Sequence, residues 1–476
     1  MSYQLDSNVA EKLKLFFSQF DYIDKVVIFG SRAKHNANPK SDIDLCIYSL
    51  EMTAKEFIKL KIELDELPIL YKIDIVHFES SNDELKKNIV KDGKLFFNRT
   101  VQLTNVCEFQ GGSQPPKSEW NDKKLDGYVR MLQIRDFTQG KDKYIQYIKD
   151  AKKLKKCTQN DILIGRYGAS IGKILTGLEG AYNVAMMKVT PSEKINREYL
   201  YHFLKGRLFQ NAIASIGSRA AQAGFNKEDL SKINIPLPSL TKQKQIAKTL
   251  DKAQELIELR KESIKRLDEL SKSIFIDMFG DPAQNPMNWE KTTLSEVCLE
   301  KGKYGSGASA VEYDNKKPRY LRITDIKDDG TLKEEKKSPS IVEEQYYLEK
   351  NSIVFARSGA TVGKTYLHLS DETLLFAGYL IKFKPNTNLI NPLYLYYFTK
   401  TNYYDEWIKS KQNVVAQPNI NEKEYSKLLI ILPSLEIQEN FANKIQKIEQ
   451  QKNFYEKQLK KLQENFDALL AQSFKA

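Results

Sequence analysis

Most of this 476-residue chain occurs in two copies, and the duplication limits the folds that are open to it. Three pairs of segments carry the repeat, at offsets of 189, 191 and 195 residues: Leu132–Asp136 with Leu321–Asp325, Ile164–Lys173 with Phe355–Lys364, and Ile235–Leu240 with Ile431–Leu435. A period of this length is far beyond the roughly 20 to 50 residues of a solenoid repeat. Residues 101–476 are therefore predicted to hold two copies of one module, which usually indicates two binding sites.

Charge separates the duplicated part from the rest. Residues 1–98 carry 14 Lys and Arg against 16 Asp and Glu, a net charge of −2, while the whole chain carries +12. The remainder therefore carries a net charge of +14. An excess of this size favours a polyanionic partner, because binding to phosphates releases condensed counterions. A lysine-rich composition that serves only solubility is the alternative.

The composition does not point to a membrane or to export. No apolar run approaches the roughly 18 residues of a membrane span, and Met1–Asp6 lacks the layout of a signal peptide. We therefore expect a soluble, cytoplasmic protein without membrane contacts. The four cysteines, Cys46, Cys107, Cys157 and Cys298, form no CxxC pair, so buried free thiols are expected rather than a zinc site.

The helix and strand signals predict an α+β protein of several domains. In residues 1–98 they predict a compact α/β unit, with helices at Asn8–Phe20 and Thr53–Glu66 and strands at Lys25–Phe29, Ile43–Tyr48 and Lys72–Phe78. From Val101 onward, short β-rich segments are interrupted by Gly, Pro and Asn. The two copies are therefore predicted to be mainly β, with a few helices.

Each β-rich copy ends in Pro-Ser-Leu and continues into a long, charged helix without internal Gly or Pro. The first helix has an apolar stripe interrupted at Arg260 and Ser271: Ile246, Leu250, Ala253, Ile257, Ile264, Leu267, Ile274 and Met278. The second has a similar stripe interrupted at Lys452: Phe441, Ile445, Ile448, Tyr455, Leu459, Leu462, Phe466 and Leu469. Two narrow stripes favour an antiparallel coiled coil over two helices that each pack on their own module. Helices of this length span about 55 to 60 Å and would act as a spacer.

The N-terminal unit contains carboxylates in a pattern suited to metal binding. Gly30 and Ser31 follow a strand, Asp42 and Asp44 come after a ten-residue segment, and Asp74 lies in a later strand. Carboxylates at i and i+2 of a strand share a face, and an adjacent strand can add a third. Three clustered carboxylates repel one another unless cations neutralise them, which favours paired Mg²⁺. Since a Gly-Ser turn at a helix start offers N–H groups to phosphate, the pattern indicates nucleotidyl transfer.

This pattern resembles the minimal nucleotidyltransferases, including antitoxin-type enzymes that transfer AMP to a partner protein. The resemblance implies that Asp42 and Asp44 hold the metals and that Asp74 completes the metal and catalytic set by activating the acceptor hydroxyl. It also implies that Gly30 and Ser31 hold the triphosphate of ATP or another nucleoside triphosphate, with Mg²⁺ as cofactor. A degenerate domain kept as a docking platform is the alternative.

The duplicated part resembles the specificity subunit of Type I restriction-modification enzymes across essentially all of residues 101–476. The motifs that carry the resemblance also have second-copy counterparts: Leu132–Phe137, Asp161–Arg166 with Gly168 and Gly172, Phe225–Asn226, and Ile235–Leu240 with Gln243 and Gln245. We expect a nucleotidyltransferase-like domain at 1–98, target-recognition domains at 101–240 and 286–435, and spacer helices at 241–280 and 436–476. That family normally begins at its first recognition domain, so the N-terminal domain is a departure from it.

DNA recognition needs flexible donors on loops that face a groove. The candidates are Arg135, Arg166, Arg219 and Gln222 in the first copy and Arg322, Arg357, Gln412 and Gln417 in the second. Each could instead contact phosphate or stabilise the fold. Arg166 and Arg357 occupy the same position in both copies, which favours a structural role, because base-reading residues should differ where the half-sites differ.

Two other motifs are better explained by structure than by chemistry. Asn391–Tyr394 approaches an amino-methyltransferase motif, but the first copy has Asn196–Tyr199 there, so Asn391 is predicted to cap a helix that starts at Pro392. Gly359–Thr365 resembles part of a phosphate-binding loop, but its glycines are one residue too close, and a turn is predicted.

We therefore expect a specificity subunit that reads a bipartite site in double-stranded DNA. It would bind methyltransferase subunits, two in number, and restriction motor-nuclease subunits. The duplicated region would be non-catalytic and without cofactor, so any enzymatic activity would lie in the N-terminal domain. The alternative is a nucleotidyltransferase that modifies a toxin or a restriction subunit and is directed to DNA or to the complex by the duplicated part.

Overall fold

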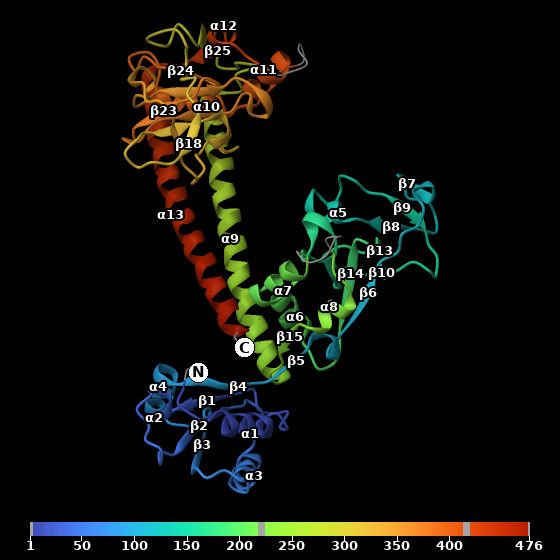
Figure 1. Ribbon diagram of the computed structural model, residues 1–476. Coiled ribbons are helices and arrows are strands. Elements are labelled where there is room, and N and C mark those ends of the chain that lie inside the picture. The colour runs from blue at the N-terminus through green and yellow to red at the C-terminus, as the bar shows by residue number, and fades with distance from the viewer. Residues whose placement is uncertain (1–2, 218–223, 413–418, 475–476) are drawn as a thin grey trace. The chain divides into compact units, whose positions relative to one another are not determined.

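The computed structural model describes residues 3–217, 224–412 and 419–474, in two compact units (Figure 1). The first unit comprises Met1–Ile257 and Lys461–Ala476, and the second comprises Glu258–Lys460. Three of the predicted DNA-reading residues, Arg219, Gln222 and Gln417, lie outside the described residues.

The first unit begins with a four-stranded sheet, in the order β3-β2-β1-β4, that carries helices. The elements are α1 (Ser7–Phe17), β1 (Lys25–Phe29), α2 (Gly30–Ala33), β2 (Ile43–Tyr48), α3 (Ala54–Asp65), β3 (Ile73–His77), α4 (Asp83–Asp92) and β4 (Lys94–Asn98). Strands β2 and β3 are parallel, and the other neighbours are antiparallel. The two predicted helices and three predicted strands are confirmed to within a few residues, whereas α4 and β4 were not predicted.

The N-terminal sheet joins the first β-rich module through a single residue. Arg99 separates β4, which pairs with β1, from β5 (Thr100–Gln102), which pairs with β15 (Asn234–Pro236). The carbonyl oxygen of Arg99 accepts a hydrogen bond of 2.8 Å from the Leu237 N–H. The buried Asp24 carboxylate accepts one of 2.7 Å from the N–H of Ser239, just before the first long helix. Backbone pairing therefore continues across the junction.

The first β-rich module contains a five-stranded and a four-stranded sheet, in the orders β10-β13-β8-β9-β7 and β12-β11-β14-β6. Its strands are β6 (Cys107–Gly111), β7 (Trp120–Asn121), β8 (Tyr128–Leu132), β9 (Tyr147–Lys149), β10 (Lys156–Cys157), β11 (Ile162–Gly165), β12 (Ile174–Leu175), β13 (Gly180–Tyr182) and β14 (Met186–Pro191). Its helices are α5 (Ile134–Thr138), α6 (Arg197–Lys205), α7 (Arg207–Gly217) and α8 (Lys227–Ser231). The long helix α9 (Leu240–Phe279) follows.

The second module repeats this arrangement. Its strands are β16 (Glu290–Thr293), β17 (Lys303–Tyr304), β18 (Ala310–Glu312), β19 (Arg319–Leu321), β20 (Lys337–Pro339), β21 (Ile353–Ala356), β22 (Thr365–Leu367), β23 (Leu374–Phe376), β24 (Leu380–Phe383) and β25 (Leu429–Leu432). Its helices are α10 (Pro392–Phe398), α11 (Asn402–Gln412) and α12 (Glu422–Ser426), followed by the long α13 (Leu435–Ser473). The sheet β22-β21-β24-β17 matches β12-β11-β14-β6, and the parallel pair β19 and β23 matches β8 and β13.

A buried glutamine holds each long helix to its module in the same way. The Gln243 side chain accepts from the N–H of Asn196 and donates to the carbonyl oxygen five residues before it, both at 2.8 Å. Gln438 makes the same two contacts, with Asn391 and with the carbonyl five residues before it, again at 2.8 Å. Asn391 also caps α10 and Pro392 opens that helix, as predicted, and Asn196 caps α6 in the same way.

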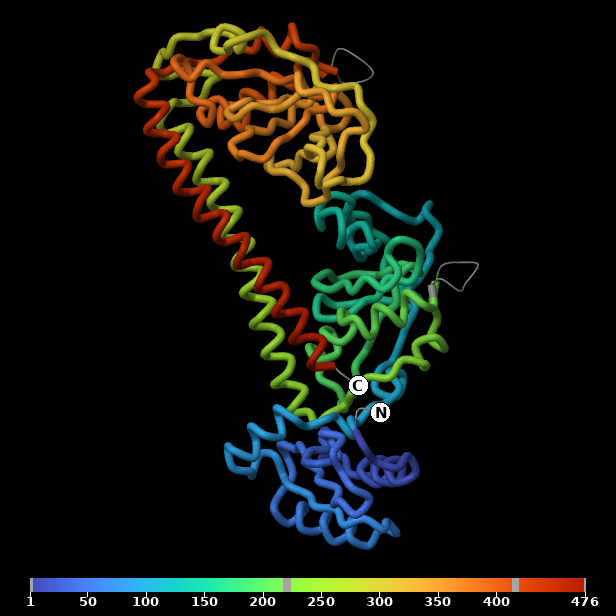
Figure 2. Tube along the Cα trace, turned by 60° about the vertical axis from the view of Figure 1, so that its left-hand side comes forward, coloured from blue at the N-terminus to red at the C-terminus, as the bar shows by residue number. Residues whose placement is uncertain are grey.

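Within the second unit, α9 and α13 lie side by side and run antiparallel (Figure 2). The ring of Phe279 packs against that of Phe441 at 5.2 Å, and the Arg260 guanidinium lies 4.1 Å from the centre of the Tyr455 ring. Arg260, which interrupts the apolar stripe, thus has a partner across the helix pair. The supercoil of a true coiled coil stays a prediction.

Within the first unit, the start of α9 and the end of α13 share a core with the first module. This cluster contains Ala247 and Leu250 from α9, Leu470 from α13 and Phe474, which directly follows α13. Phe474 packs against Tyr199 of α6 at 4.9 Å between ring centres. No helix in the described part of the chain is both long and apolar enough to cross a membrane.

Candidate functional site

The turn after β1 requires a glycine. Gly30 has a φ of +69°, a conformation that residues with a side chain rarely adopt. A Cβ atom at this position would lie 2.2 Å from Asp44 Oδ2, which is far inside van der Waals contact. Gly30 therefore lets the turn and the start of α2 approach the Asp44 carboxylate closely.

Arg32 fixes the segment that leads into β2. It is buried, and its guanidinium donates to the carbonyl oxygens of Asp42 at 3.1 Å, Ser41 at 2.6 Å and Gln4 at 3.0 Å. The same group lies over the ring of Tyr71 at 4.6 Å. Arg32 thus holds the Asp42 backbone against the Gly-Ser turn.

The three predicted carboxylates come together at one edge of the sheet. Asp44 and Asp74 are directly opposed in the parallel pair β2 and β3, and Asp42 immediately precedes β2. Burial, and next the negative charges of Asp74 and Asp42, raise the pKa of Asp44. The cluster therefore carries the charge repulsion that the i, i+2 spacing predicts.

A lysine contacts two of these carboxylates. The Lys72 ammonium lies 2.8 Å from Asp74 Oδ2 and 3.5 Å from Asp42 Oδ2. In this arrangement no group of three or more His, Cys, Asp and Glu side chains among residues 3–217, 224–412 and 419–474 is placed to hold a metal ion. Asp42 and Asp74 nevertheless converge on one cationic group, so the donors suit a divalent cation in the place of the ammonium. A bound metal stays a prediction.

Lys72 and Arg32 are functional candidates that sequence reasoning missed. Lys72 and Asp74 are two residues apart in the predicted strand Lys72–Phe78, so the sequence does indicate that they share a face. The contacts of Arg32 are with residues 9, 10 and 28 positions away, and no local sequence pattern predicts them.

The cysteines do not add a reactive group. All four are free; Cys46, Cys107 and Cys157 are buried as expected, and Cys298 is partly buried. Burial raises the thiol pKa to about 12 for Cys46, Cys107 and Cys298 and, as the largest of several causes, to about 11 for Cys157. Such thiols carry almost no thiolate at neutral pH and are poor nucleophiles.

Two of the predicted DNA-reading arginines are held within their own modules. Arg322 forms an ion pair of 2.6 Å with the buried Asp325, whose carboxylate also accepts from the Arg322 N–H. Arg135 donates to Gln146 at 2.9 Å and lies over the ring of Tyr144. Gln412, a third candidate, is the last residue of α11.

Arg166 and Arg357 occupy equivalent places at the ends of β11 and β21. The Arg166 guanidinium donates to the Phe225 carbonyl oxygen at 3.3 Å, and Arg357 Nε donates to Asn419 Oδ1 at 3.2 Å. Each arginine thus ties its loop to the segment that follows α7 or α11. These contacts agree with the structural role that their shared position suggests, and base contacts of either residue stay a prediction.

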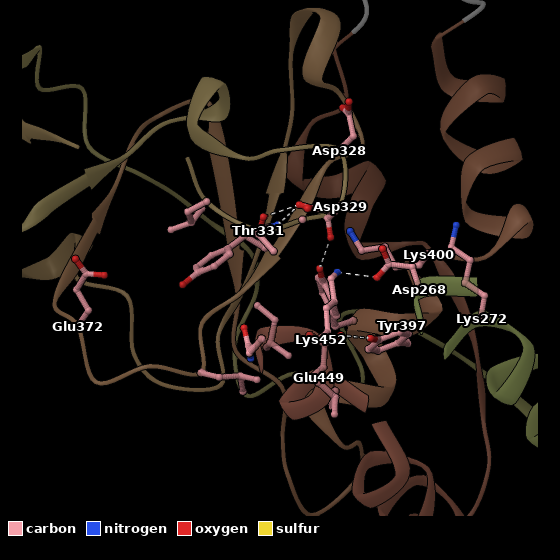
Figure 3. A pocket seen from close by; sticks show the side chains of 18 of the residues that line it. Asp268, Lys272, Asp328, Asp329, Thr331, Glu372, Tyr397, Lys400, Glu449 and Lys452 are labelled. Carbon is pink, nitrogen blue, oxygen red and sulfur yellow. Dashed lines mark hydrogen bonds and ion pairs between the residues drawn. The ribbon is translucent and has the colours of Figure 1, made fainter. Parts of the chain in front are cut away.

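The second unit contains a cavity of about 540 Å³ between the second module and the two long helices (Figure 3). Each acidic residue that lines it has a donor within the chain: Asp268 from Lys452 (2.6 Å), Asp328 from Lys364 (2.7 Å), Asp329 from Thr331 (2.8 Å), Glu372 from Lys336 (2.7 Å) and Glu449 from Tyr397 (2.6 Å). Burial lowers the pKa of Lys400, another lining residue, to about 8. The cavity is therefore lined by charges of both signs, and its acidic side chains already have partners within the chain.

Comparisons with known proteins find family matches for both the N-terminal domain and the duplicated part of the chain. The profile of the Type I restriction modification DNA specificity domain matches twice, at residues 98–269 and 286–464. The profile of the polymerase beta nucleotidyltransferases matches residues 11–102.

Individual relatives match the duplicated part at low identity. The Type I restriction enzyme MjaVIII specificity subunit of Methanocaldococcus jannaschii is 24% identical over 376 residues, which cover 73% of this chain and 85% of the relative. The EcoBI specificity subunit of Escherichia coli is 22% identical over 390 residues, which cover 75% and 81%. A solved S subunit from M. genitalium covers 79% of this chain and 96% of its own, with 17% identity and a TM-score of 0.48.

Proposed function

Because this chain belongs to the Type I restriction modification DNA specificity family, we propose that its two modules each read one half of a bipartite site in double-stranded DNA. The main support for the proposal is that the family profile matches the chain twice and that each match contains one of the two repeated modules of the fold. The net charge of +14 outside residues 1–98 supports a polyanionic ligand.

We further propose that the long helices bind two methyltransferase subunits and, in the restricting complex, motor-nuclease subunits. Several large apolar side chains of α9 are exposed, among them Leu256, Leu259, Leu270 and Ile276. Exposed apolar side chains on a charged helix support contact with a partner protein. The helices would also separate the modules, since each has about 40 residues and a rise of about 1.5 Å per residue.

For the N-terminal domain we propose metal-dependent nucleotidyl transfer to a hydroxyl group. The hydroxyl oxygen would bond to the α-phosphorus of ATP or another nucleoside triphosphate, and pyrophosphate would leave. Bound Mg²⁺ would neutralise the carboxylates and polarise the phosphoryl group under attack. Asp42 and Asp44 would hold the metals, and Asp74 would complete the set and take the proton of the acceptor hydroxyl. The backbone N–H groups of Gly30 and Ser31 would bind phosphate oxygens, while Arg32 keeps the turn and Asp42 together.

The deciding experiment is to co-express the chain with its methyltransferase subunit, purify the complex and sequence the methylated sites of the host. We expect a bipartite motif that disappears when either module is deleted. The methyltransferase expressed without this chain is the control. A stable complex that methylates no site, or one whose motif has a single part, would contradict the proposal.

The N-terminal activity has a separate test. The purified complex is incubated with Mg²⁺ and ATP labelled on the α-phosphate, and label transfer to protein is measured with and without EDTA. Transfer that depends on the metal and on Asp42 and Asp44 supports the proposal. Absence of transfer to any component of the complex or of a cell lysate would favour a docking platform.

A further inference from the structure

The shared arginines identify equivalent positions in the two modules. The N–H of Arg166 donates to the carbonyl oxygen of Ala185 at 2.8 Å, and the N–H of Arg357 donates to that of Tyr379 at 3.1 Å. Strands β14 and β24 begin at the next residue in each case. Ala185 and Tyr379 therefore occupy the same place, beside the shared arginine and at the start of a central strand.

One feature of this place is common to both modules. The Arg166 guanidinium lies 5.0 Å from the ring centre of Tyr167, and that of Arg357 lies 4.8 Å from the ring centre of Tyr304. The two tyrosines come from different positions in the repeat but have similar exposures of 42% and 40%. An arginine that lies over a half-exposed tyrosine is thus conserved between the modules in space, although not in sequence.

The side chains at the equivalent positions 185 and 379 differ in size and character between the two modules. The first module has a small alanine at this place, whereas the second has a tyrosine whose side chain is 61% exposed. A large aromatic side chain that is not packed into its own module gains little for the fold. Its position next to the arginine and tyrosine pair makes the second module bulkier and more aromatic at this point than the first.

The backbone around Tyr379 is held on both sides. The N–H of Gly378 donates to Ser306 at 2.7 Å, and the carbonyl oxygen of Leu380 accepts from Gly305 at 3.3 Å. A Cβ at Gly305 would lie 2.3 Å from the Phe376 carbonyl oxygen, so the two segments are in close contact. Because the backbone at Tyr379 is already held, fixing its ring on a ligand costs little entropy.

We propose that Tyr379 is a specificity-determining residue that contacts a base edge in the half-site read by the second module. Residues that read bases must differ between modules that read different sequences, and Tyr379 differs where the surrounding scaffold is shared. Its ring suits the methyl group of thymine, and its hydroxyl can exchange a hydrogen bond with a base. This inference rests on the proposed DNA-recognition function of the duplicated part.

The test uses the full chain co-expressed with its methyltransferase subunits, with Tyr379→Ala, Tyr379→Phe and the control Tyr313→Ala. Tyr313 is a 43% exposed tyrosine of the same module that lies beside Lys336. We expect Tyr379→Ala to relax one or more positions of one half-site by about tenfold, with the other half-site unchanged. Tyr379→Phe keeps the preference if the ring reads the base and loses it if the hydroxyl does. Tyr313→Ala should leave both half-sites unaltered.

The outcomes separate the two proposals. A wild-type complex without a bipartite motif contradicts the proposed function itself. A wild-type motif that persists unchanged in Tyr379→Ala overturns only the role of Tyr379. If Tyr379→Ala abolishes methylation, the purified, folded complex is used to select DNA from a random pool. An altered preference in one half-site supports the inference. Uniformly weaker binding, as expected for a phosphate contact, overturns it.

Discussion

At the residue scale, Lys72 forms ion pairs within the carboxylate cluster of the N-terminal domain. Its ammonium contacts Asp42 and Asp74, two of the three carboxylates that would hold divalent cations. An ammonium and a metal ion repel each other when both lie near the same carboxylates. Metal binding to this domain therefore competes with the contacts of Lys72.

Replacing Lys72 with methionine should tighten metal binding. The change removes the competing charge from a largely exposed pair, which corresponds to an affinity gain of about two- to fivefold. Mn²⁺ titration followed by calorimetry measures the effect without any catalytic assay. Lys59→Met, which removes a lysine paired with Glu63 on α3, is the matched control and should leave the affinity unaltered. Equal affinities in Lys72→Met and wild type would contradict the competition.

Asp24 is a second residue whose charge has a testable consequence. Its carboxylate accepts from Ser239 at the start of α9, and burial, as the largest effect, raises the pKa of Asp24 above its usual 3.8. The ionised form therefore costs folding free energy, a cost that appears as the pH rises through 3.8 towards the raised value and is complete above it.

Substitutions at Asp24 should separate the hydrogen bond from the charge. Asp24→Ala removes the acceptor and should destabilise the first unit by about 1 kcal/mol. Asp24→Asn keeps an acceptor without the buried charge, so it should be at least as stable as wild type at neutral pH, with an advantage that shrinks towards pH 3.8. Thermal unfolding across this pH range is the measurement. A loss as large in Asn as in Ala would show that the carboxylate charge is needed.

At the scale of elements, polar residues interrupt the apolar stripes along which the two long helices pack. The Lys452 side chain is only 7% exposed, and its ammonium lies 2.6 Å from Asp268 of α9. Although burial acts to lower it, the hydrogen bond to Asp268 raises the pKa of Lys452 overall. A polar pair inside an otherwise apolar seam can fix the register of two helices.

The two members of this pair should respond differently to substitution. Asp268→Asn leaves a buried ammonium without its counter-charge and should destabilise the second unit by about 1 to 3 kcal/mol. Lys452→Met places an apolar chain of similar length in the seam and should have a small or stabilising effect. Chemical denaturation of the two variants and of the double variant provides the comparison. If Lys452→Met is the more damaging change, the pair contributes more than its desolvation costs.

The sequence predicts the elements better than it predicts their contacts. The long helices expected at 241–280 and 436–476 are observed at Leu240–Phe279 and Leu435–Ser473, because the Pro-Ser-Leu boundary and the apolar stripe are local signals. Strand periodicity likewise predicts that Asp42, Asp44 and Asp74 lie close together, and Asp44 and Asp74 are opposed in the paired strands β2 and β3. The bonds of Arg32 and the equivalence of Ala185 and Tyr379 depend on pairing between distant segments, so only the folded chain reveals them.

At the scale of the whole molecule, the two proposed functions occupy separate domains with separate cores. Asp42→Asn combined with Asp44→Asn should abolish nucleotide transfer, because the remaining carboxylate cannot hold the metals. DNA binding and the methylated motif should remain those of the wild type. Fluorescence anisotropy with DNA and the label-transfer assay measure the two activities on one preparation. Loss of DNA binding in the double variant would show that the domains depend on each other.

The single-residue junction at Arg99 also limits how an acceptor can reach the N-terminal domain. A flexible linker raises the local concentration of a tethered acceptor, but one residue supplies only about 3.5 Å of slack. The acceptor hydroxyl must therefore be brought to the domain on a separate molecule or on a subunit that docks beside it. For a free acceptor the turnover per enzyme molecule would rise with acceptor concentration. For a docked subunit the turnover per complex would not change on dilution, so a dilution series identifies which kind of acceptor the domain serves.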